Sequence, residues 1–414
     1  MAPRQTASAL SVGNAARPDA ALLLRVSGPD HPGITADLMA LLGVAEVDVQ
    51  DVEQVLVRGH LTLAVAVADP GDGGTALAAV LEQLTRRHDV TVSVVPAPAP
   101  PLISDPVEAV TVLGHELETP LSPAEIGAIA AGINASGGNI DRIVRLARYP
   151  VYAYEFRVTG ADPAALTKHL GAAASAHRLD VALQPAGLER RAKRLVVLDV
   201  DSTLIQDEVI ELLAEEAGCL DEVRAVTERA MAGELDFERA LRERVQRLAG
   251  LDQQAVDRAR SRMRLTPGAR TFVRTLKRLG YIVGIVSGGF THFTDGLASE
   301  LGLDHARANQ LEVVNGVLTG NVLGDVVDRG AKAGFLRAFA EAEGIPLSQT
   351  VAVGDGANDL DMLAAAGLGI AFNAKPLVQE AADTTVNVPY LDAILFVLGV
   401  TRDEVVRADT ASED

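Results

Sequence analysis

Apolar and polar positions follow two different rhythms along this chain. In the first half, short apolar runs alternate with segments of helical spacing: ALLLRVS at 21–27 predicts a strand, and Ile34, Leu38 and Leu42 then fall on one helical face. A Val-rich segment, the alternating strand HLTLAVAVA, a second amphipathic helix and the strand TVSVV follow. This order predicts a ferredoxin-like β-α-β-β-α-β unit.

The same order recurs after a proline-rich segment, PAPAPP at 96–101, which is expected to form a stiff linker. The second unit consists of the strand AVTVL, a helix that begins at Pro123, the paired strands NIDRIVRLARY and VYAYEFRV, a helix opened by DPAALTKHL, and the strand LDVAL. This repetition predicts a duplicated small domain.

From residue 194 onward the predicted strands are apolar on both faces. The runs LVVLDV, YIVGIVS, TVAVGD and GIAF alternate with helical segments, which is typical of a parallel sheet covered by helices. Residues 207–262 interrupt this pattern with charged, helix-rich sequence that carries no strand signal. We therefore expect an α/β fold with a doubly wound parallel sheet and a helical cap inserted after its first strand.

These patterns divide the 414 residues into several domains, as the length of the chain also suggests. The expected segments are a flexible tail at 1–18, a first ferredoxin-like domain at 19–96, a linker at 97–106, a second such domain at 107–185, the doubly wound domain at 194–398 with its cap at 207–262, and an acidic C-terminal tail at 399–414.

Charge and cysteine content narrow the function classes. The formal net charge of -19 argues against a nucleic-acid partner, because polyanions are bound by basic surfaces. No run approaches roughly 18 uninterrupted apolar residues, so no membrane span is expected, and residues 1–18 lack the apolar stretch of a signal peptide. The single cysteine, Cys219, excludes an internal disulfide and fits the reducing cytoplasm.

Polar side chains gather where the predicted parallel strands end. Ligands of doubly wound sheets bind beyond the carboxyl ends of the strands, and side chains two residues apart on a strand point to the same side. Carboxylates or small polar residues follow three of the strands, namely Asp199 and Asp201 after LVVL, Ser287 with Gly288 and Gly289 after YIVGIV, and Asp355 and Asp359 in GDGAND after VAV.

Several acids converging at one edge repel one another unless a cation lies among them. Mg²⁺ suits carboxylates, water and phosphate oxygen, whereas no spaced cysteine or histidine group supports zinc. Glycines after Ser287 let backbone N–H groups approach an anion at a helix start, and Lys332 adds a positive charge. Together these residues indicate phosphoryl transfer, in which an aspartate can be the nucleophile.

Each element also has an ordinary structural interpretation. Two aspartates separated by one residue are common in turns, Ser287 with its glycines fits a tight strand-to-helix turn, and an isolated Lys332 fits a solvated surface lysine. GDGAND resembles part of a calcium loop but lacks its remaining ligands. Only the combination, with each element at a strand end or on the helix that follows, favours a functional site.

The four motifs, DVDST, the Ser287 turn, Lys332 and GDGAND, resemble those of the haloacid dehalogenase superfamily of phosphatases, over residues 194–398. The resemblance implies that Asp199 attacks phosphorus. It also implies that Asp201 protonates the leaving oxygen and then activates water, which requires a raised pKa that we attribute to neighbouring acids and phosphate. The implied ligand sets are Asp199, the carbonyl of Asp201, Asp355 and supporting Asp359 for Mg²⁺, and Ser287, Gly288, Lys332 and neighbouring Asn358 for phosphate.

The cap resembles that of the phosphoserine phosphatases in particular. Glu208, Met231, Phe237 and Arg244 stand where that family places residues that contact the substrate. The resemblance implies that Glu208 meets the ammonium of phosphoserine and that Arg244 meets its carboxylate. From the residues alone, a helix cap for Glu208 and a surface ion pair for Arg244 are the simpler interpretations.

The two N-terminal units resemble ACT domains, which bind small amino acids. GPDHPGIT at 28–35 matches the first loop of that family, whereas the second unit lacks the D-H-P-G core. The resemblance implies an L-serine effector near Asp30 and Gly33 and a homodimer formed through residues 19–185; a purely dimerising role is the alternative. Two rivals for the whole chain remain: a phosphatase or phosphotransferase acting on another metabolite, and an amino-acid sensor with an inactive phosphatase half.

Overall fold

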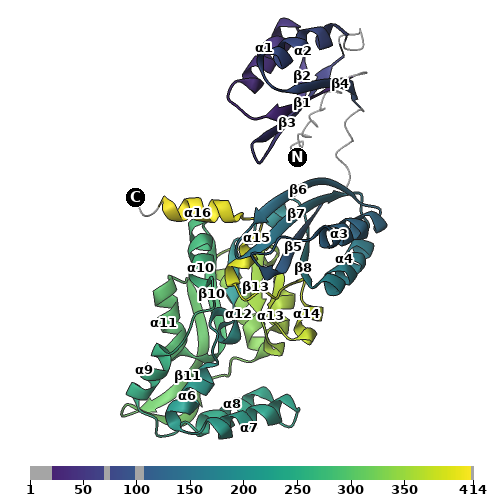
Figure 1. The fold of residues 1–414 in the computed structure, drawn as a ribbon. Helices are drawn as coiled ribbons and strands as arrows, with labels where there is room; N and C mark the ends of the chain where they lie inside the picture. Colours follow the sequence, from purple (N-terminus) through teal and green to yellow (C-terminus); the bar gives the residue numbers. More distant parts are fainter. Residues whose placement is uncertain (1–20, 70–74, 98–106, 412–414) are drawn as a thin grey trace, which may run out of the picture. The chain divides into compact units, whose positions relative to one another are not determined.

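The computed structural model describes residues 21–69, 75–97 and 107–411. The chain forms two compact units, residues 1–104 and 105–414, and each is described by itself (Figure 1). The predicted tail at 1–18 and all but the first residue of the predicted linker at 97–106 lie outside the described residues.

The first unit has the predicted β-α-β-β-α-β order. Its antiparallel sheet has the strand order β2-β3-β1-β4. Alternate residues of β1 and β3 are buried, because one face of the sheet packs against the two helices in a separate core. The elements are β1 (Ala21–Pro29), α1 (Ile34–Val44), β2 (Val49–Val57), β3 (His60–Ala68), α2 (Thr75–Arg87) and β4 (Thr91–Ala97).

The second unit begins with the predicted repeat of this arrangement. Its sheet has the order β6-β7-β5-β8, which is the same pattern shifted along the chain. Local sequence fixes the helix starts: Ser122 and Glu125 form a capping box at the start of α3, with Pro123 as its first residue, and Asp162 caps α4. The elements are β5 (Val107–Leu117), α3 (Pro123–Ala135), β6 (Asn139–Ala147), β7 (Val151–Thr159), α4 (Pro163–His177) and β8 (Leu179–Pro185), followed by the short α5 (Leu188–Arg191).

The remainder of the second unit is built on a seven-stranded sheet in the order β12-β11-β10-β9-β13-β14-β15. All neighbouring strands are parallel except β12, which runs antiparallel to β11. The strands are β9 (Leu195–Leu198), β10 (Ile282–Phe290), β11 (His305–Val314), β12 (Val317–Leu323), β13 (Thr350–Gly354), β14 (Gly369–Phe372) and β15 (Thr384–Val386).

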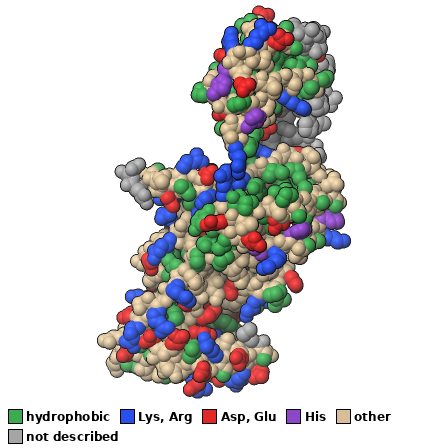
Figure 2. All heavy atoms as spheres, in the orientation of Figure 1, with side chains coloured by type: hydrophobic (Ala, Val, Ile, Leu, Met, Phe, Trp, Pro, Cys, Tyr) green, Lys and Arg blue, Asp and Glu red, His purple; other side chains and the backbone are tan. Residues whose placement is uncertain are grey.

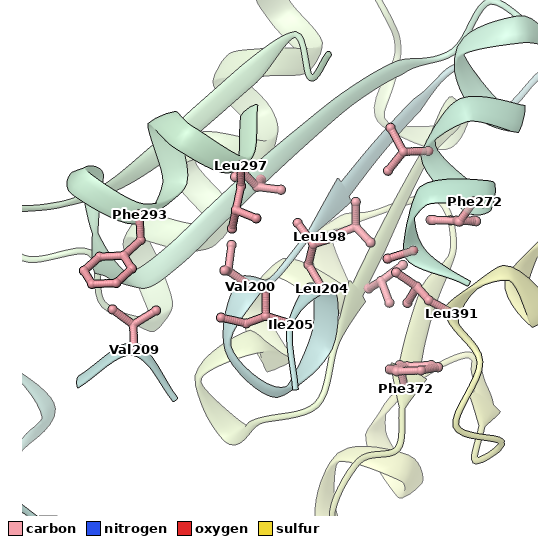
Figure 3. Packing of buried hydrophobic residues seen from close by; sticks show 14 of the residues in the cluster. Leu198, Val200, Leu204, Ile205, Val209, Phe272, Phe293, Leu297, Phe372 and Leu391 are labelled. Carbon is pink, nitrogen blue, oxygen red and sulfur yellow. The ribbon is translucent and has the colours of Figure 1, made fainter. Parts of the chain in front are cut away.

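Strand β9 lies at the centre of this sheet and is fully buried. Leu195 and Val197 contribute to the core on one side, whereas Val196 and Leu198 contribute to the core on the other. Figure 3 shows Leu198 among buried side chains that include Phe272 and Phe293, which belong to the helices on that second side. The first core contains α12 (Arg329–Ala342) and α13 (Leu360–Ala365), and the second contains α10 (Ala269–Arg278) and α11 (Thr291–Leu301).

The segment between β9 and β10 begins with the predicted helical cap. Figure 2 shows charged side chains of both signs over these helices, and many are paired, as in Arg224 with Glu211 and Arg229 with Glu243. Such exposed pairs stabilise little individually but keep the surface soluble. The cap helices are α6 (Val209–Ala217), α7 (Leu220–Met231), α8 (Phe237–Gln246) and α9 (Gln253–Ser261).

The C-terminal segment differs from the prediction. Residues 399–414 were expected to form an acidic tail, but they contain helix α16 (Arg402–Thr410). Thr401 and Glu404 form a capping box that starts this helix, and Val405 is buried. Asp409 also pairs with Arg274 and Arg278, so acidic composition did not prevent packing.

The second ACT-like sheet contacts the seven-stranded sheet within one compact unit. Asp180 of β8 is 1 % exposed, and it accepts hydrogen bonds from the backbone and side chain of Asn387. Arg190 joins Glu155 to the carbonyl of Val397. Within the part of the chain that is described, no helix has the length and apolar character needed to cross a membrane.

Candidate active site

Asp199 follows β9 directly and is almost completely buried, at 3 % exposure. Its backbone N–H donates to the carbonyl of Val353 on β13, which fixes the end of the strand. The chain then makes the tight turn η1 (Val200–Leu204), in which Ser202 adopts a φ of 57°. This left-handed conformation is uncommon outside glycine, and it turns the chain just after Asp201, whose side chain lies at the same site.

Lys332 lies in the first turn of α12, a helix capped by Asp328. Its ammonium donates to Asp199 Oδ1 at 2.5 Å and to Asp359 Oδ1 at 2.7 Å, and the residue is 0 % exposed. Burial by itself would lower the pKa of Lys332, but the two carboxylates outweigh it and raise the pKa. A solvated surface lysine, the ordinary interpretation, is therefore wrong for this residue.

The carboxylate of Asp201 is held by the start of the cap and by the Ser287 turn. It accepts the backbone N–H of Val209 at 2.7 Å and the hydroxyl of Ser287 at 3.0 Å. Burial is the main cause that raises the pKa of Asp201, and these hydrogen bonds oppose it. The direction agrees with the expectation for a proton donor, but the expected cause was incomplete because neighbouring acids are not the dominant influence.

The Ser287 turn differs in detail from the sequence-based interpretation. Gly289 donates its N–H to the hydroxyl of Ser287 at 2.7 Å, so this group already has a partner, and α11 begins only at Thr291. A Cβ at Gly289 would lie 3.1 Å from Asp201 Oδ2, which explains why glycine fits there. Ser287 is fully buried, whereas Gly288 lines the cavity described below.

Asp355 and Asp359 follow β13 and approach Asp199. One oxygen from each of the three carboxylates lies within 4.8 Å of the others. Burial and the charge of Asp359 raise the pKa of Asp355 to about 6, and burial and Asp359 also raise that of Asp199. Lys332 compensates only part of this negative charge, and three convergent hard oxygens fit a divalent cation of the Mg²⁺ type. The side chain of Asp201 is outside this group.

Residues of the cap face this strand-end cluster. Glu208 precedes α6 but does not cap it; its side chain instead accepts the hydroxyl of Ser202 at 2.8 Å. Although part of Glu208 is open to the cavity, withdrawal from bulk solvent and the nearby Asp201 raise its pKa to about 7. Glu208 holds the N-cap position of α6, but its side chain makes no capping hydrogen bond, which argues against the helix-cap interpretation.

Arg244 of α8 also turns inward. It donates to the carbonyl of Ala240 and to Thr227 Oγ1, at 3.3 and 3.4 Å, and no carboxylate within the described residues forms an ion pair with it. Burial lowers its pKa, although Glu208 acts in the opposite direction. The surface ion pair considered above is therefore absent in this part of the structure, and the guanidinium retains donors for a ligand.

Core and cap together enclose a cavity of about 420 Å³. Phe237, the first residue of α8, lies close to Gly288 in this cavity: a Cβ at that glycine would be 3.2 Å from the phenyl ring. Met231 ends α7, and its side chain lies outside the described residues. The predicted residues that line the cavity are Asp199, Asp201, Glu208, Phe237, Arg244, Gly288, Asp355 and Asn358.

Sequence reasoning missed two polar residues in this lining, Thr227 and Lys375. Thr227 follows the buried Val226 and lies one turn after the buried Val223, so its spacing is that of an ordinary amphipathic helix. Lys375 precedes Pro376 after the strand GIAF, which was a recognised strand end. That placement was the available signal for Lys375, whereas Thr227 offered none.

The predicted regulatory residues lie in the first unit. Asp30 is exposed, and its N–H donates to the carbonyl of Gly59. Gly33 precedes α1 with a φ of 108°, and no side chain caps this helix. A cluster that the sequence did not suggest lies beside it: His88 contacts Asp37 at 2.9 Å and His31 at 3.3 Å.

Comparison with known proteins agrees with this architecture. Residues 196–364 match the family of haloacid dehalogenase-like hydrolases, and residues 20–95 and 107–184 each match an ACT domain family. Fold and site thus define a haloacid dehalogenase-like hydrolase that carries two ACT domains.

Two curated relatives cover almost the entire chain. The phosphoserine phosphatase of Streptomyces coelicolor is 56 % identical over 398 residues, with 95 % of each chain covered. Phosphoserine phosphatase SerB2 of Mycobacterium tuberculosis is 48 % identical over 397 residues, which cover 94 % of this chain and 95 % of that one. The chain belongs to the phosphoserine phosphatase family.

A solved structure supports the assignment. The unliganded crystal structure of a probable phosphoserine phosphatase from Vibrio cholerae is 38 % identical, with a TM-score of 0.57, and it covers 73 % of this chain and 88 % of its own. A haloacid dehalogenase family hydrolase from Salmonella enterica is 28 % identical, with a TM-score of 0.61, covering 70 % of this chain and 98 % of its own.

Proposed function

We propose that this protein is a cytoplasmic enzyme that hydrolyses O-phospho-L-serine to L-serine and phosphate, the last step of serine biosynthesis. The observation that carries the proposal is the single cavity in which Asp199 faces Glu208 and Arg244. A carboxylate nucleophile, an anion for an ammonium and a cation for a carboxylate match the three functional groups of phosphoserine. The intact set of Asp199, Asp201, Lys332 and Asp355 argues against a sensor with an inactive phosphatase half.

Asp199 is the nucleophile in this proposal. Attack of its carboxylate on phosphorus forms an aspartyl-phosphate and breaks the bond to the serine oxygen. Lys332 is fixed 2.5 Å from Asp199 Oδ1, so its charge reduces the repulsion between the carboxylate and the phosphate dianion. Ser287, Gly288 and Asn358 would help to position the phosphate, Ser287 mainly by holding Asp201.

Asp201 acts as the proton donor and acceptor. A serine alkoxide is a poor leaving group, so a general acid accelerates its departure by about 10²–10⁴-fold. Burial raises the pKa of Asp201, which favours the protonated form that this step requires. Once serine has left, the same carboxylate can take a proton from the water that attacks the aspartyl-phosphate.

The three-carboxylate cluster of Asp199, Asp355 and Asp359 fits Mg²⁺, with the backbone carbonyl of Asp201 as a further oxygen ligand. When bound, the ion would neutralise negative charge on the phosphate and orient it for attack. Asp359 also binds Lys332 and the N–H of Gly356, so its part would be to support the site.

Substrate recognition depends on the cap. The carboxylate of Glu208 would bind the ammonium of phosphoserine, and Arg244 would bind its carboxylate. Phe237 lies close to Gly288 and lines the cavity, where it would contact the substrate, and Met231 is proposed to contact the substrate as well. Recognition of both charges would distinguish an amino-acid phosphate from sugar or nucleotide phosphates.

A release assay tests this proposal directly. Phosphate release should be measured over a panel that contains phosphoserine, phosphothreonine, sugar phosphates and p-nitrophenyl phosphate. We expect the highest kcat/KM for phosphoserine. A clear preference for a phosphate that lacks the amino-acid group would instead support the alternative, a phosphatase or phosphotransferase acting on another metabolite.

We also propose that the first ACT domain binds L-serine. The start of α1 has no side-chain cap, so its N–H groups can receive a carboxylate, and the exposed Asp30 can receive the ammonium. The fragment 1–104 is the appropriate test object, because it forms a compact unit with its own core, whereas a cut at residue 185 would separate Asp180 from Asn387.

Calorimetric titration of serine into this fragment should show binding to the wild type and weakened binding to Asp30→Ala. The fragment lacks the phosphatase site, so product binding cannot contribute. Absence of binding to the wild-type fragment would leave the ACT domains with a dimerising role alone.

A homodimer through the ACT domains is proposed from strand β2. This strand is at the edge of its sheet, and all nine of its residues are exposed. Val55, Leu56 and Val57 are among the exposed apolar residues, at 42–62 %, and such an edge invites pairing with a second copy. Sedimentation of the full chain should show a dimer, and Val55→Lys with Leu56→Lys should shift it toward monomer; an unchanged dimer would place the interface elsewhere.

A further inference from the structure

A lysine that the sequence analysis did not identify, Lys375, lines the substrate cavity. Four carboxylates line the cavity, but the only lysine or arginine side chains in its described lining are Arg244 and Lys375. Lys332 is not among the lining residues, because it is fully buried between Asp199 and Asp359. Beside the Mg²⁺ proposed above, Lys375 is therefore the basic side chain that a phosphate could contact directly on the side of the parallel sheet.

Lys375 is available to bind an anion. It follows β14 and immediately precedes α14 (Pro376–Ala381), and it is exposed. Within the described residues, its ammonium forms no hydrogen bond or ion pair that would compete for a ligand. A flexible four-carbon side chain with three donors suits a phosphate group, which it can approach from several directions.

We infer that Lys375 is a further substrate-binding residue that contacts the phosphate group, and that the second ACT domain positions it. The inference rests on the proposed phosphatase function but does not depend on which phosphate monoester is the natural substrate.

The position of Lys375 favours the phosphate over the carboxylate of the substrate. Strand β14 lies next to β13 in the parallel sheet, so the loop of Lys375 is adjacent to the loop that carries Asp355 and Asn358. These residues surround the place of the phosphate in the proposed mechanism. Arg244 belongs to the cap and faces the cavity from the other wall.

A chain of hydrogen bonds connects the Lys375 loop to the second ACT domain. Gln379 Nε2 donates to the carbonyl of Ala374 at 2.6 Å and to Asn387 Oδ1 at 2.9 Å. The backbone N–H of Asn387 and its side-chain amide donate to Asp180 at 2.6 and 2.8 Å. His115 of β5 also contacts Asp180, at 3.0 Å.

Through these hydrogen bonds, the buried carboxylate of Asp180 in the second ACT domain helps to fix the position of Ala374, the residue before Lys375. Val378 and Gln379 donate their N–H groups to the carbonyl of Lys375 itself. The backbone carbonyls of both Ala374 and Lys375 are therefore held by hydrogen bonds. Movement of β8 relative to β15 would therefore shift the backbone from which the Lys375 side chain reaches the cavity. Gln379, Asn387 and Asp180 are positioning residues, since none of them lines the cavity.

Removal of the charge at Lys375 gives the first test. For Lys375→Met, KM for p-nitrophenyl phosphate and the competitive inhibition constant of inorganic phosphate should both rise about tenfold, the cost of one charge-assisted hydrogen bond. The change in kcat should stay within about threefold, because Lys375 would bind the phosphate in both the ground state and the transition state. Both probes lack the amino-acid group, so the result is independent of a failure to prefer phosphoserine.

Two further variants make this test specific. Lys375→Arg should recover phosphate inhibition to within about threefold of the wild type, since it retains the charge. Lys168→Met, at an exposed lysine of α4 outside the cavity, should behave as the wild type. Unchanged inhibition by phosphate in Lys375→Met, or equal defects in the Met and Arg variants, would overturn the assignment.

The connection to the ACT domain is tested by Gln379→Met and Asp180→Asn. Each should raise the inhibition constant of phosphate by about threefold, as expected for a loss of positioning rather than of the charge, and neither should add to the defect of Lys375→Met. Asp180 is buried, whereas Gln379 is only partly buried and therefore provides the decisive double mutant. Full additivity of Gln379→Met with Lys375→Met would contradict the positioning role.

Discussion

Lys332 Nζ lies 2.5 Å from Asp199 Oδ1, and both residues are buried at the end of the central strand. A second buried carboxylate, Asp359, accepts from the same ammonium at 2.7 Å. One cation therefore serves two anions that have little access to solvent. This relationship fixes the direction of Asp199 and couples the stability of the site to its charge.

Replacement of Lys332 should reveal this coupling. Lys332→Met leaves two buried carboxylates without their cation, and breaking such a pair costs about 3–5 kcal/mol of unfolding free energy. Without the ammonium, burial should raise the pKa of the Asp199 carboxyl further above its unfolded value. The loss should therefore be largest at pH 8, where the unfolded state is charged, and smaller at pH 5, where the native Asp199 carboxyl can hold a proton.

Urea unfolding of Lys332→Met, with Lys168→Met as the matched control, measures the difference. The exposed control should change little at either pH. An equal loss of stability at pH 5 and pH 8 would show that burial of the ion pair does not govern the site.

Glu208 should make the use of phosphoserine depend on pH near neutrality. Its pKa is raised to about 7, and only the charged carboxylate can bind the substrate ammonium. For phosphoserine, kcat/KM should fall as the pH decreases through 7. Glu208→Gln should lose this dependence, and p-nitrophenyl phosphate should lack it in both proteins, which separates Glu208 from titration of the phosphate itself. A shared profile for both substrates would assign the titration to another group.

Arg244 should determine specificity rather than chemistry. Arg244→Ala should reduce kcat/KM for phosphoserine by about 10²-fold, because a bidentate contact to a carboxylate is lost, and should affect p-nitrophenyl phosphate far less. The ratio of the two kcat/KM values is the measurement. Equal losses on both substrates would mean that Arg244 only supports the fold of the cap.

Much of the site was predictable because polar residues at the ends of apolar strands are conspicuous. Acidic side chains are unusual directly after fully apolar strands, and this position identified Asp199, Asp201 and Asp355. The structure brings all three to one cavity. The sequence also suggested that Glu208 and Arg244 face inward, but only through the family resemblance, because a charged residue on a cap helix is normally solvated.

Other features needed the three-dimensional arrangement. The hairpin of β11 and β12 was not predicted, although Asn315 and Gly316 carry the positive φ values of 51° and 77° that an Asn-Gly turn favours. Thr401 and Glu404 likewise have the spacing of a capping box, which predicts a helix start where we expected a tail. The long-range link from Asp180 to Asn387 left no local pattern, since each partner is an ordinary polar residue in its own segment.

The carboxylate cluster of Asp199, Asp355 and Asp359 predicts that activity depends on a divalent metal ion. Treatment with EDTA should abolish activity, and Mg²⁺ should restore it, whereas Ca²⁺ should substitute poorly because it prefers more ligands and a looser geometry. Asp355→Asn should require a higher Mg²⁺ concentration for half-maximal activity. Full activity in a metal-free preparation would contradict the assignment of this cluster.

The central claim is that Asp199 is the nucleophile, and its amide variant tests it most directly. Asp199→Asn preserves the size of the side chain and keeps an oxygen that can accept from Lys332, so thermal unfolding should confirm a folded protein. The measurement is the turnover of phosphoserine by this variant at saturating Mg²⁺. We expect a loss of at least about 10³-fold, because an amide cannot form the phosphorylated intermediate. Turnover within about tenfold of the wild type in the folded variant would contradict the account.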